Sequence, residues 1–158
     1  MKWITVPGNE FIRYPFLEND GGRSQSRRPK QSNDCTVRAL AIACEKPYDD
    51  VYGFLRTLGR ECGRRFNMKI LITPPRGRNG AEIQTFLGAK LVWRSFPAVK
   101  GQRRMNPVQF TLTFTRGRFI CRTAKHVFAV IDGVVYDTEP ESADRCIYGA
   151  WAVERLPQ

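Results

Sequence analysis

The chain has 158 residues, 42% of them hydrophobic, which predicts one domain over residues 1–158 with a single core. Its 26 Lys and Arg exceed 15 Asp and Glu, and the formal net charge of +11 favours acidic or polyanionic partners. The composition argues against a disulfide scaffold, a secreted precursor and a membrane protein. The cysteines are odd in number and scattered, and no apolar run is long enough for a signal peptide or a membrane span. We therefore expect a cytoplasmic protein with reduced thiols.

The first third of the chain is predicted to hold one strand, a basic loop and two helices. Residues 1–6 favour a strand, and residues 13–30 are polar, basic and rich in turn formers, which is typical of an exposed arm or loop. Potential capping residues at 31–34 precede an Ala-rich apolar segment, so we expect a helix over 35–44 that is packed on most faces. A second, amphipathic helix is expected from Pro47 to Gly59.

The rest of the chain predicts two more helices and several strands. Residues 60–78 indicate a basic loop with at most one short strand, and a helix follows Gly80 and stops at Gly88. Residues 90–96 favour a strand, whereas the segment after Pro107 mixes helical and strand signals and is assigned to a helix. Four strands are expected at 119–122, 126–131, 134–138 and 146–154. This order predicts an α+β domain, with N-terminal helices packed on a C-terminal antiparallel sheet.

Cys35 is the first residue of a predicted helix, which is a favourable place for a nucleophilic thiolate. The unpaired amides of a first helical turn lower the pKa of a thiol there and can donate to an oxyanion. A buried small thiol in the core is the alternative interpretation of Cys35. No cysteine pair has the short spacing of a zinc motif, so neither a metal nor a cofactor is expected.

His126 is the only histidine, and it begins a strand that ends in a predicted tight turn at Asp132 and Gly133. Pairing Ile131 with Val134 and counting back places the following carboxylates, Asp137 and Glu139, on the face of His126. Either carboxylate could orient the imidazole. Asp137 is preferred because Pro140 disturbs pairing at Glu139. A lone histidine is also often structural, but these neighbours favour a Cys-His-Asp site.

The segment from Gln31 through Cys35 to Leu40, followed by His126 to Val130 and Val135 to Asp137, resembles the papain-like cysteine peptidase superfamily. In particular, it resembles small papain-like proteins of tailed bacteriophages. The resemblance implies Cys35 as nucleophile at the start of a central helix, His126 as general base and acid, and Asp137 as its orienting partner. It implies Gln31 as oxyanion donor, with Asn33 or a backbone amide as alternates. The aromatic-rich signature around the papain cysteine is missing, which indicates a distant relative and not a papain or cathepsin. If the protein is phage-encoded, the expected location is the host cytoplasm.

The expected function is that of a cysteine hydrolase, peptidase or isopeptidase-like, acting through an acyl-thioester on a protein or peptide substrate, which the basic charge suggests is acidic. One alternative is a basic module that binds nucleic acid or a host protein without catalysis. The segments that suggest it are Arg23 to Lys30, Arg60 to Arg65, Arg76 to Arg78 and Lys100 to Arg104. A second alternative is transglutaminase-like acyl transfer by the same triad.

Overall fold

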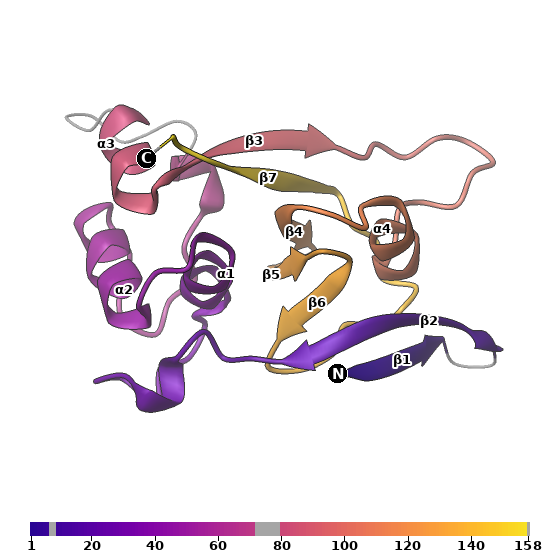
Figure 1. Ribbon diagram of the computed structural model, residues 1–158, viewed down its shortest axis with the longest axis horizontal. Coiled ribbons are helices and arrows are strands. Elements are labelled where there is room, and N and C mark those ends of the chain that lie inside the picture. The colour runs from indigo at the N-terminus through magenta and orange to yellow at the C-terminus, as the bar shows by residue number, and fades with distance from the viewer. Residues whose placement is uncertain (7–8, 72–79, 158) are drawn as a thin grey trace.

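The computed structural model describes the backbone of residues 1–6, 9–71 and 80–157. It also describes the side chains of these residues, except those of residues 6–12. The described chain is α+β, as predicted, with four α-helices and one seven-stranded mixed sheet in the order β1-β2-β6-β5-β4-β7-β3 (Figure 1). The strands are β1 (Lys2–Val6), β2 (Asn9–Glu18), β3 (Ala89–Ser95), β4 (Arg118–Thr123), β5 (His126–Ile131), β6 (Val134–Asp137) and β7 (Gly149–Arg155). The α-helices are α1 (Cys35–Cys44), α2 (Tyr48–Thr57), α3 (Gly80–Leu87) and α4 (Pro107–Thr113), and two short 3-10 helices are η1 (Arg23–Gln25) and η2 (Met68–Leu71).

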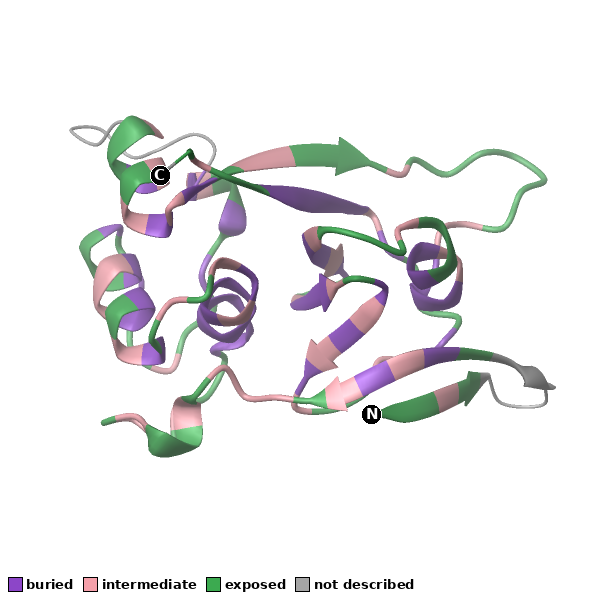
Figure 2. Cartoon of the chain, in the orientation of Figure 1, coloured by how far each residue is buried: buried purple, intermediate pink, exposed green. Residues whose placement is uncertain are grey.

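Helices cover both faces of the sheet (Figure 1). α1 packs against β4, β5 and β6, with α2 behind it, whereas α4 packs against β2 and β6 from the other side. Each face has its own buried cluster, one around Leu40 and Trp151 and the other around Phe110 and Phe128. Figure 2 shows the result, with α1 and the middle strands mostly buried and β1 largely exposed.

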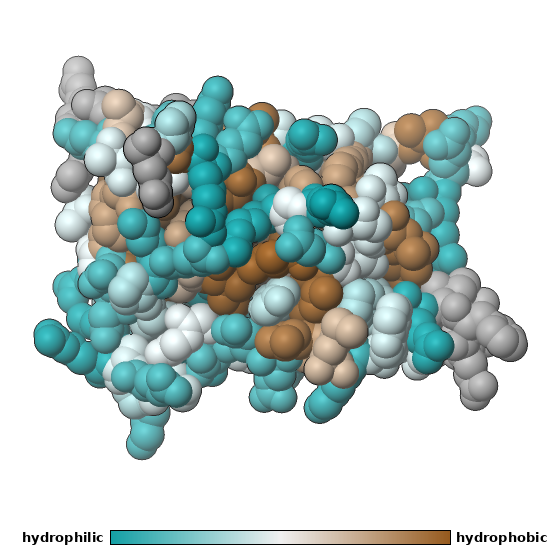
Figure 3. Space-filling model, in the orientation of Figure 1, coloured by the Kyte–Doolittle hydropathy of each residue, from teal (hydrophilic) through white to brown (hydrophobic). Residues whose placement is uncertain are grey.

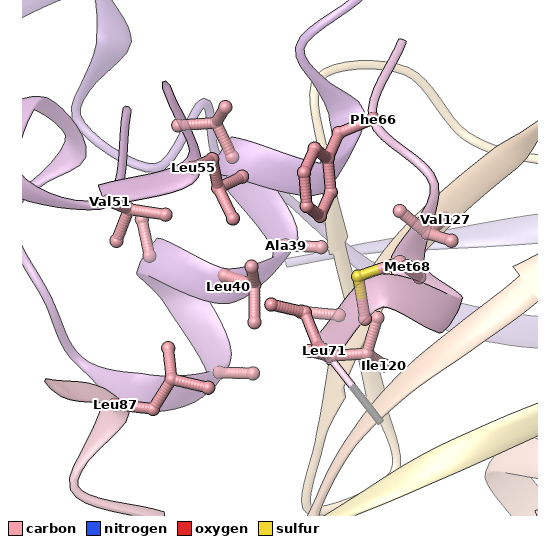
Figure 4. Close-up of a cluster of buried hydrophobic side chains, with 14 of the residues drawn as sticks. Ala39, Leu40, Val51, Leu55, Phe66, Met68, Leu71, Leu87, Ile120 and Val127 are labelled. Carbon is pink, nitrogen blue, oxygen red and sulfur yellow. The ribbon is translucent and has the colours of Figure 1, made fainter. Parts of the chain in front are cut away.

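The helix α1 is the central element of the larger cluster. It begins at Cys35 and buries most of its residues, as the Ala-rich sequence predicts. Leu40 is fully buried and lies among the apolar side chains of α2, α3, η2 and the sheet (Figure 4). The helix ends at Glu45, whose φ of 53° is left-handed and lets its amide donate to Ala41 and Ile42. Packing around its circumference holds the N-terminal end of α1 in one place.

The hairpin between β5 and β6 has the predicted register. Ile131 pairs with Val134 and Val130 with Val135, and the turn residues Asp132 and Gly133 have φ values of 48° and 76°. Positive φ at both positions matches the twist of the two strands. The helix expected after Pro107 is also confirmed, and the Asn106 side chain caps it by accepting from the Gln109 amide at 2.9 Å.

The N-terminal segment differs from the predicted basic arm over residues 13–30. Residues 13–18 continue β2, with Tyr14 and Phe16 buried, and only the part after Glu18 forms turns and η1. β2 pairs in parallel with β6, so the sheet is mixed and recruits N-terminal strands instead of being a purely antiparallel C-terminal unit. The amide of Asn19 then donates to the Asp137 carbonyl at 2.8 Å. Two aromatic side chains, alternating along β2, supply the buried area that makes this pairing favourable.

Other segments refine the predicted elements. Within 60–78 the described residues contain η2 and no strand, and residues 72–78 lie outside the described part of the chain. The strand predicted from 146 begins at Gly149. None of the described helices is both long and apolar enough to cross a membrane. Polar residues cover most of the face drawn in Figure 3, with hydrophobic residues gathered near its centre.

A glycine pair tests the hairpin that carries His126 and Asp137. Gly133→Ala should lower the free energy of unfolding by about 1–3 kcal/mol, because L-residues are strained at positive φ. The new Cβ would also lie 3.1 Å from the Thr111 carbonyl oxygen. Gly53 lies in α2, where an added Cβ would have nothing within 4 Å. Gly53→Ala should therefore raise the free energy of unfolding by up to about 1 kcal/mol. Urea unfolding measures both changes, and equal effects would contradict this account of the turn.

Candidate active site

The first residue of α1 meets the first residue of β5. The Cys35 thiol is hydrogen-bonded to the His126 ring and also accepts the amide of Val127. Nε2 of His126 lies 2.5 Å from Oδ2 of Asp137, so Nδ1 is the ring nitrogen left for the sulfur. Thus Cys35, His126 and Asp137, which the sequence predicts together, form one chain of hydrogen bonds. A base whose second nitrogen is held by a carboxylate has the orientation that proton transfer requires.

The environment of this chain favours a thiolate–imidazolium pair. Burial acts to raise the pKa of Cys35, but the hydrogen bonds from His126 and Val127 and the nearby positive charge lower it below its ordinary value. Burial acts to lower the pKa of His126, but the hydrogen bond to Asp137 and the contact with Cys35 raise it to about 9. The thiol therefore loses its proton more readily than usual while the ring keeps its own.

Asp137 is held in place from three sides. Burial acts to raise its pKa, yet the His126 hydrogen bond and the charge of Arg38 keep that pKa below its usual range. Its Oδ1 accepts from Arg38 and from the Thr138 amide, the latter at 2.7 Å. Glu139, the other predicted carboxylate, is exposed and makes no hydrogen bond to the ring within the described structure. Asp137 is the carboxylate in contact with His126.

Arg38 and Asp34 support the site, and the sequence interpretation missed both. Nε of Arg38 lies 3.1 Å from Oδ1 of Asp34, while its Nη1 reaches Asp137 and Oγ1 of Thr138. Asp34 is itself 2% exposed and also accepts from the Tyr48 hydroxyl at 2.7 Å. The signal in the sequence was an arginine inside an otherwise apolar helix, four residues after an aspartate.

The N-terminal end of α1 keeps its first amides free of a side-chain cap. Asp34 occupies the capping position but makes no capping bond, because its carboxylate is turned to Arg38 and Tyr48. The first backbone bond of the helix runs from the Arg38 amide to the Asp34 carbonyl. The amides of Cys35 and Thr36 precede that bond and can donate to a negatively charged oxygen beside the sulfur.

Gln31 and Asn33, the predicted oxyanion residues, are not brought to the Cys35 sulfur. Nε2 of Gln31 donates to the Ser32 carbonyl at 3.2 Å, and its Oε1 lies 3.7 Å from Sγ of Cys62. Nδ2 of Asn33 donates to the Gly63 carbonyl at 2.8 Å. Both side chains thus point to the 62–63 loop. This arrangement does not support the oxyanion role predicted for Gln31 or for its alternate Asn33.

A pocket of about 230 Å³ opens beside Cys35 and His126. Its floor is apolar and includes Phe66, Met68 and Val127, which lie next to one another in Figure 4. The loop before η2 is tied to α1 by the Thr36 hydroxyl, which donates to the Phe66 carbonyl at 3.4 Å. A small group can therefore be held beside the Cys35 sulfur on this side.

Glu141 is an additional carboxylate near His126. Its Oε1 lies 3.6 Å from Nε2, and its Oε2 lies 3.1 Å from Nε of Arg145. His126, Asp137 and Glu141 place three possible metal ligands within 4.8 Å of one another. Asp137 is already paired with Arg38 and Glu141 with Arg145, and the raised pKa of His126 opposes the neutral ring that a metal needs. The donor set fits a charged hydrogen-bond network better than a metal centre.

The remaining cysteines lack the environment of Cys35. Burial raises the pKa of Cys44 to about 12 and raises that of Cys121 well above its ordinary value. Cys62 and Cys146 are exposed, and neither contacts the histidine in the described structure. Cys35 is therefore the thiol with a base beside it.

Comparisons with known proteins returned no relative: no protein-family model, no curated protein and no solved structure matches the chain.

Replacing Arg38 tests the buried charge network. Arg38→Gln should lower the free energy of unfolding by about 3–5 kcal/mol, because Asp34 and Asp137 lose their shared counter-charge inside the protein. Arg64→Gln is the matched control, since the Arg64–Glu61 pair is exposed and should contribute at most about 1 kcal/mol. Both values come from urea unfolding. Similar losses in the two variants would show that the network is not a stabilising one.

The pH dependence of alkylation tests the Cys35–His126 pair. Because the thiol pKa is lowered, Cys35 should stay reactive toward iodoacetamide as the pH falls below the range of ordinary thiols. The imidazolium, whose pKa is about 9, is lost as the pH rises through that value. His126→Ala leaves the burial but removes the opposing charge, so the lower inflection should rise by about 1–3 pH units.

Labelling at each pH is followed by mass spectrometry, with the exposed Cys146 in the same sample as internal control. An unchanged Cys35 profile in His126→Ala would contradict the ion pair.

Proposed function

We propose that the protein is a cysteine hydrolase that cleaves a peptide or isopeptide bond through an acyl-thioester. The observation that carries this proposal is the hydrogen-bonded chain from Cys35 through His126 to Asp137. The Cys35 thiolate attacks the carbonyl carbon and forms a tetrahedral intermediate. The negatively charged oxygen of this intermediate accepts hydrogen bonds from the first amides of α1. His126 gives its proton to the leaving amine. It then takes a proton from water, which attacks the thioester and releases a carboxylic acid, so that the Cys35 thiolate and the His126 imidazolium are restored.

We also propose that the fold is a distant variant of the papain-like architecture. What supports it is the position of Cys35 at the start of a central helix packed on a sheet, with His126 and Asp137 on the adjacent strands β5 and β6. The chain order of the three residues is that of the family whose motifs they resemble. A host-cytoplasm location for a phage-encoded protein remains part of this proposal.

The basic segments give less support to the alternative of a nucleic-acid-binding module. Arg28 pairs with Asp49 at 2.7 Å and stacks over the Tyr52 ring, and Arg60 is 4% exposed and stacks on the same ring. These arginines are part of the folded structure and are not free to form a continuous surface for phosphates. Binding to an oligonucleotide at low salt that survives Cys35→Ala would favour this alternative.

The proposed hydrolase is tested with a proteome-derived peptide mixture, in which new N-termini are detected by mass spectrometry. Cys35→Ser, His126→Ala and Asp137→Asn should each reduce turnover by at least about a hundredfold, because they remove the nucleophile, the base or its orientation. Cys62→Ser and Glu139→Gln are matched controls that should keep turnover. Added methylamine separates water from amine as acceptor, since acyl transfer would give methylamide products.

Iodoacetamide labelling gives a second readout that needs no substrate. Cys35 should be labelled faster than the other four cysteines, and the preference should be lost in His126→Ala. Equal labelling of several cysteines, or turnover that survives Cys35→Ser, would overturn the proposed function.

A further inference from the structure

The pocket beside Cys35 is lined by four positively charged side chains and by no carboxylate. Arg65 and Lys69 come from the loop and 3-10 helix that form one wall, and Arg122 and Lys125 come from the end of β4 and the turn before β5. Within the described residues none of the four forms an ion pair. Elsewhere in the site the cations are matched, as Arg38 is with Asp34 and Asp137. The wall of this pocket therefore carries positive charge with no direct ion pair, and the described carboxylates nearest to it, Asp137, Glu139 and Glu141, border the adjoining pocket shared by Arg65 and Lys125.

Two buried polar atoms of the same pocket also have no partner. Nε1 of Trp151 and Oγ1 of Thr123 belong to side chains that are each 1% exposed, and neither atom makes a hydrogen bond to another described residue. An indole N–H can only donate, and a hydroxyl can donate as well as accept. Buried donors without acceptors are unfavourable in the free protein.

The size and floor of the pocket limit the ligand to a small group with an apolar stem. Its volume of about 230 Å³ is below the roughly 300–1,000 Å³ of pockets for larger ligands. The apolar floor of Phe66, Met68 and Val127 suits methylene groups, whereas the cations at the wall suit a negative end. A carboxylate side chain has both properties.

We propose that this pocket selects an acidic residue, Glu or Asp, next to the bond that Cys35 attacks. The assignment rests on the proposed hydrolase function, because it takes Cys35 as the reacting atom. The carboxylate is attracted by Arg65, Lys69, Arg122 and Lys125, and its methylene groups lie against Phe66, Met68 and Val127. Since a phosphodiester chain would also be attracted by these cations, nucleic acid is the outcome that the test must separate.

Paired alkylating agents test the pocket without knowledge of the sequence preference. Iodoacetate carries a carboxylate and iodoacetamide is its neutral counterpart, and the ratio of their rates at one pH cancels the thiolate fraction of Cys35. The wild-type ratio should exceed that of the exposed Cys146 by on the order of tenfold at low salt, and it should fall as salt is added. Lys69→Gln and Arg122→Gln should lower the ratio severalfold, whereas Lys100→Gln, which removes the same charge away from the pocket, should not.

Peptide pairs that differ only by Glu or Gln near the cleaved bond complete the test. The Glu peptide should be cleaved at least about tenfold faster in kcat/KM at one position, and Arg122→Gln should reduce that preference. Selective Cys35 labelling and cleavage without any preference for the acid would refute the acidic pocket and leave the hydrolase intact. Failure of Cys35 to label selectively would refute the hydrolase itself. Protection of Cys35 by an oligonucleotide, with no preference for Glu, would assign the pocket to nucleic acid.

Discussion

The position of the whole site depends on one buried guanidinium. Arg38 projects from α1 and binds Asp34 at the start of its own helix and Asp137 at the end of β6, two carboxylates that burial would otherwise make unfavourable. Through Asp137 it fixes the ring of His126, and through Asp34 it draws the capping carboxylate away from the first amides of α1. One charged side chain thus orients the His126 ring and leaves the first amides of α1 without a side-chain cap. Each of these three buried charges would be unfavourable without the other two, so the ion pairs form only when all three side chains are in place.

The sequence predicted the parts of the site that local patterns encode. Asp132 and Gly133 determine the hairpin register that brings Asp137 to the side of His126, and the Ala-rich run determines the helix that begins at Cys35. The parallel pairing of β2 with β6 could not be predicted, because it joins distant segments and depends on Tyr14 and Phe16 finding a core. The buried ion pairs of Arg38 and the unpartnered atoms of Trp151 and Thr123 could not be predicted from the sequence either, because burial and hydrogen-bond partners are properties of the folded chain.

The excess of basic residues has more than one physical role. Arg38 neutralises internal carboxylates, and Arg28 and Arg60 both stack on the ring of Tyr52. Only part of the net charge of +11 is therefore available to a partner, and the portion at Arg65 and Lys69 lines the pocket beside Cys35. Net charge alone indicates attraction to acidic molecules, whereas its distribution indicates where such a molecule would meet the sulfur.

The parallel contact between β2 and β6 links chemistry to the completion of the polypeptide. Arg38 and Asp137 are 99 residues apart, and β6 is held by an N-terminal strand on one side and by β5 on the other. A chain emerging from the ribosome makes α1 long before the strands that carry the base and its carboxylate. Until they arrive, neither the His126 ring nor the Val127 amide is present to lower the pKa of the Cys35 thiol. The environment that lowers the thiol pKa is thus completed by residues synthesised long after Cys35, when β5 and β6 join the sheet.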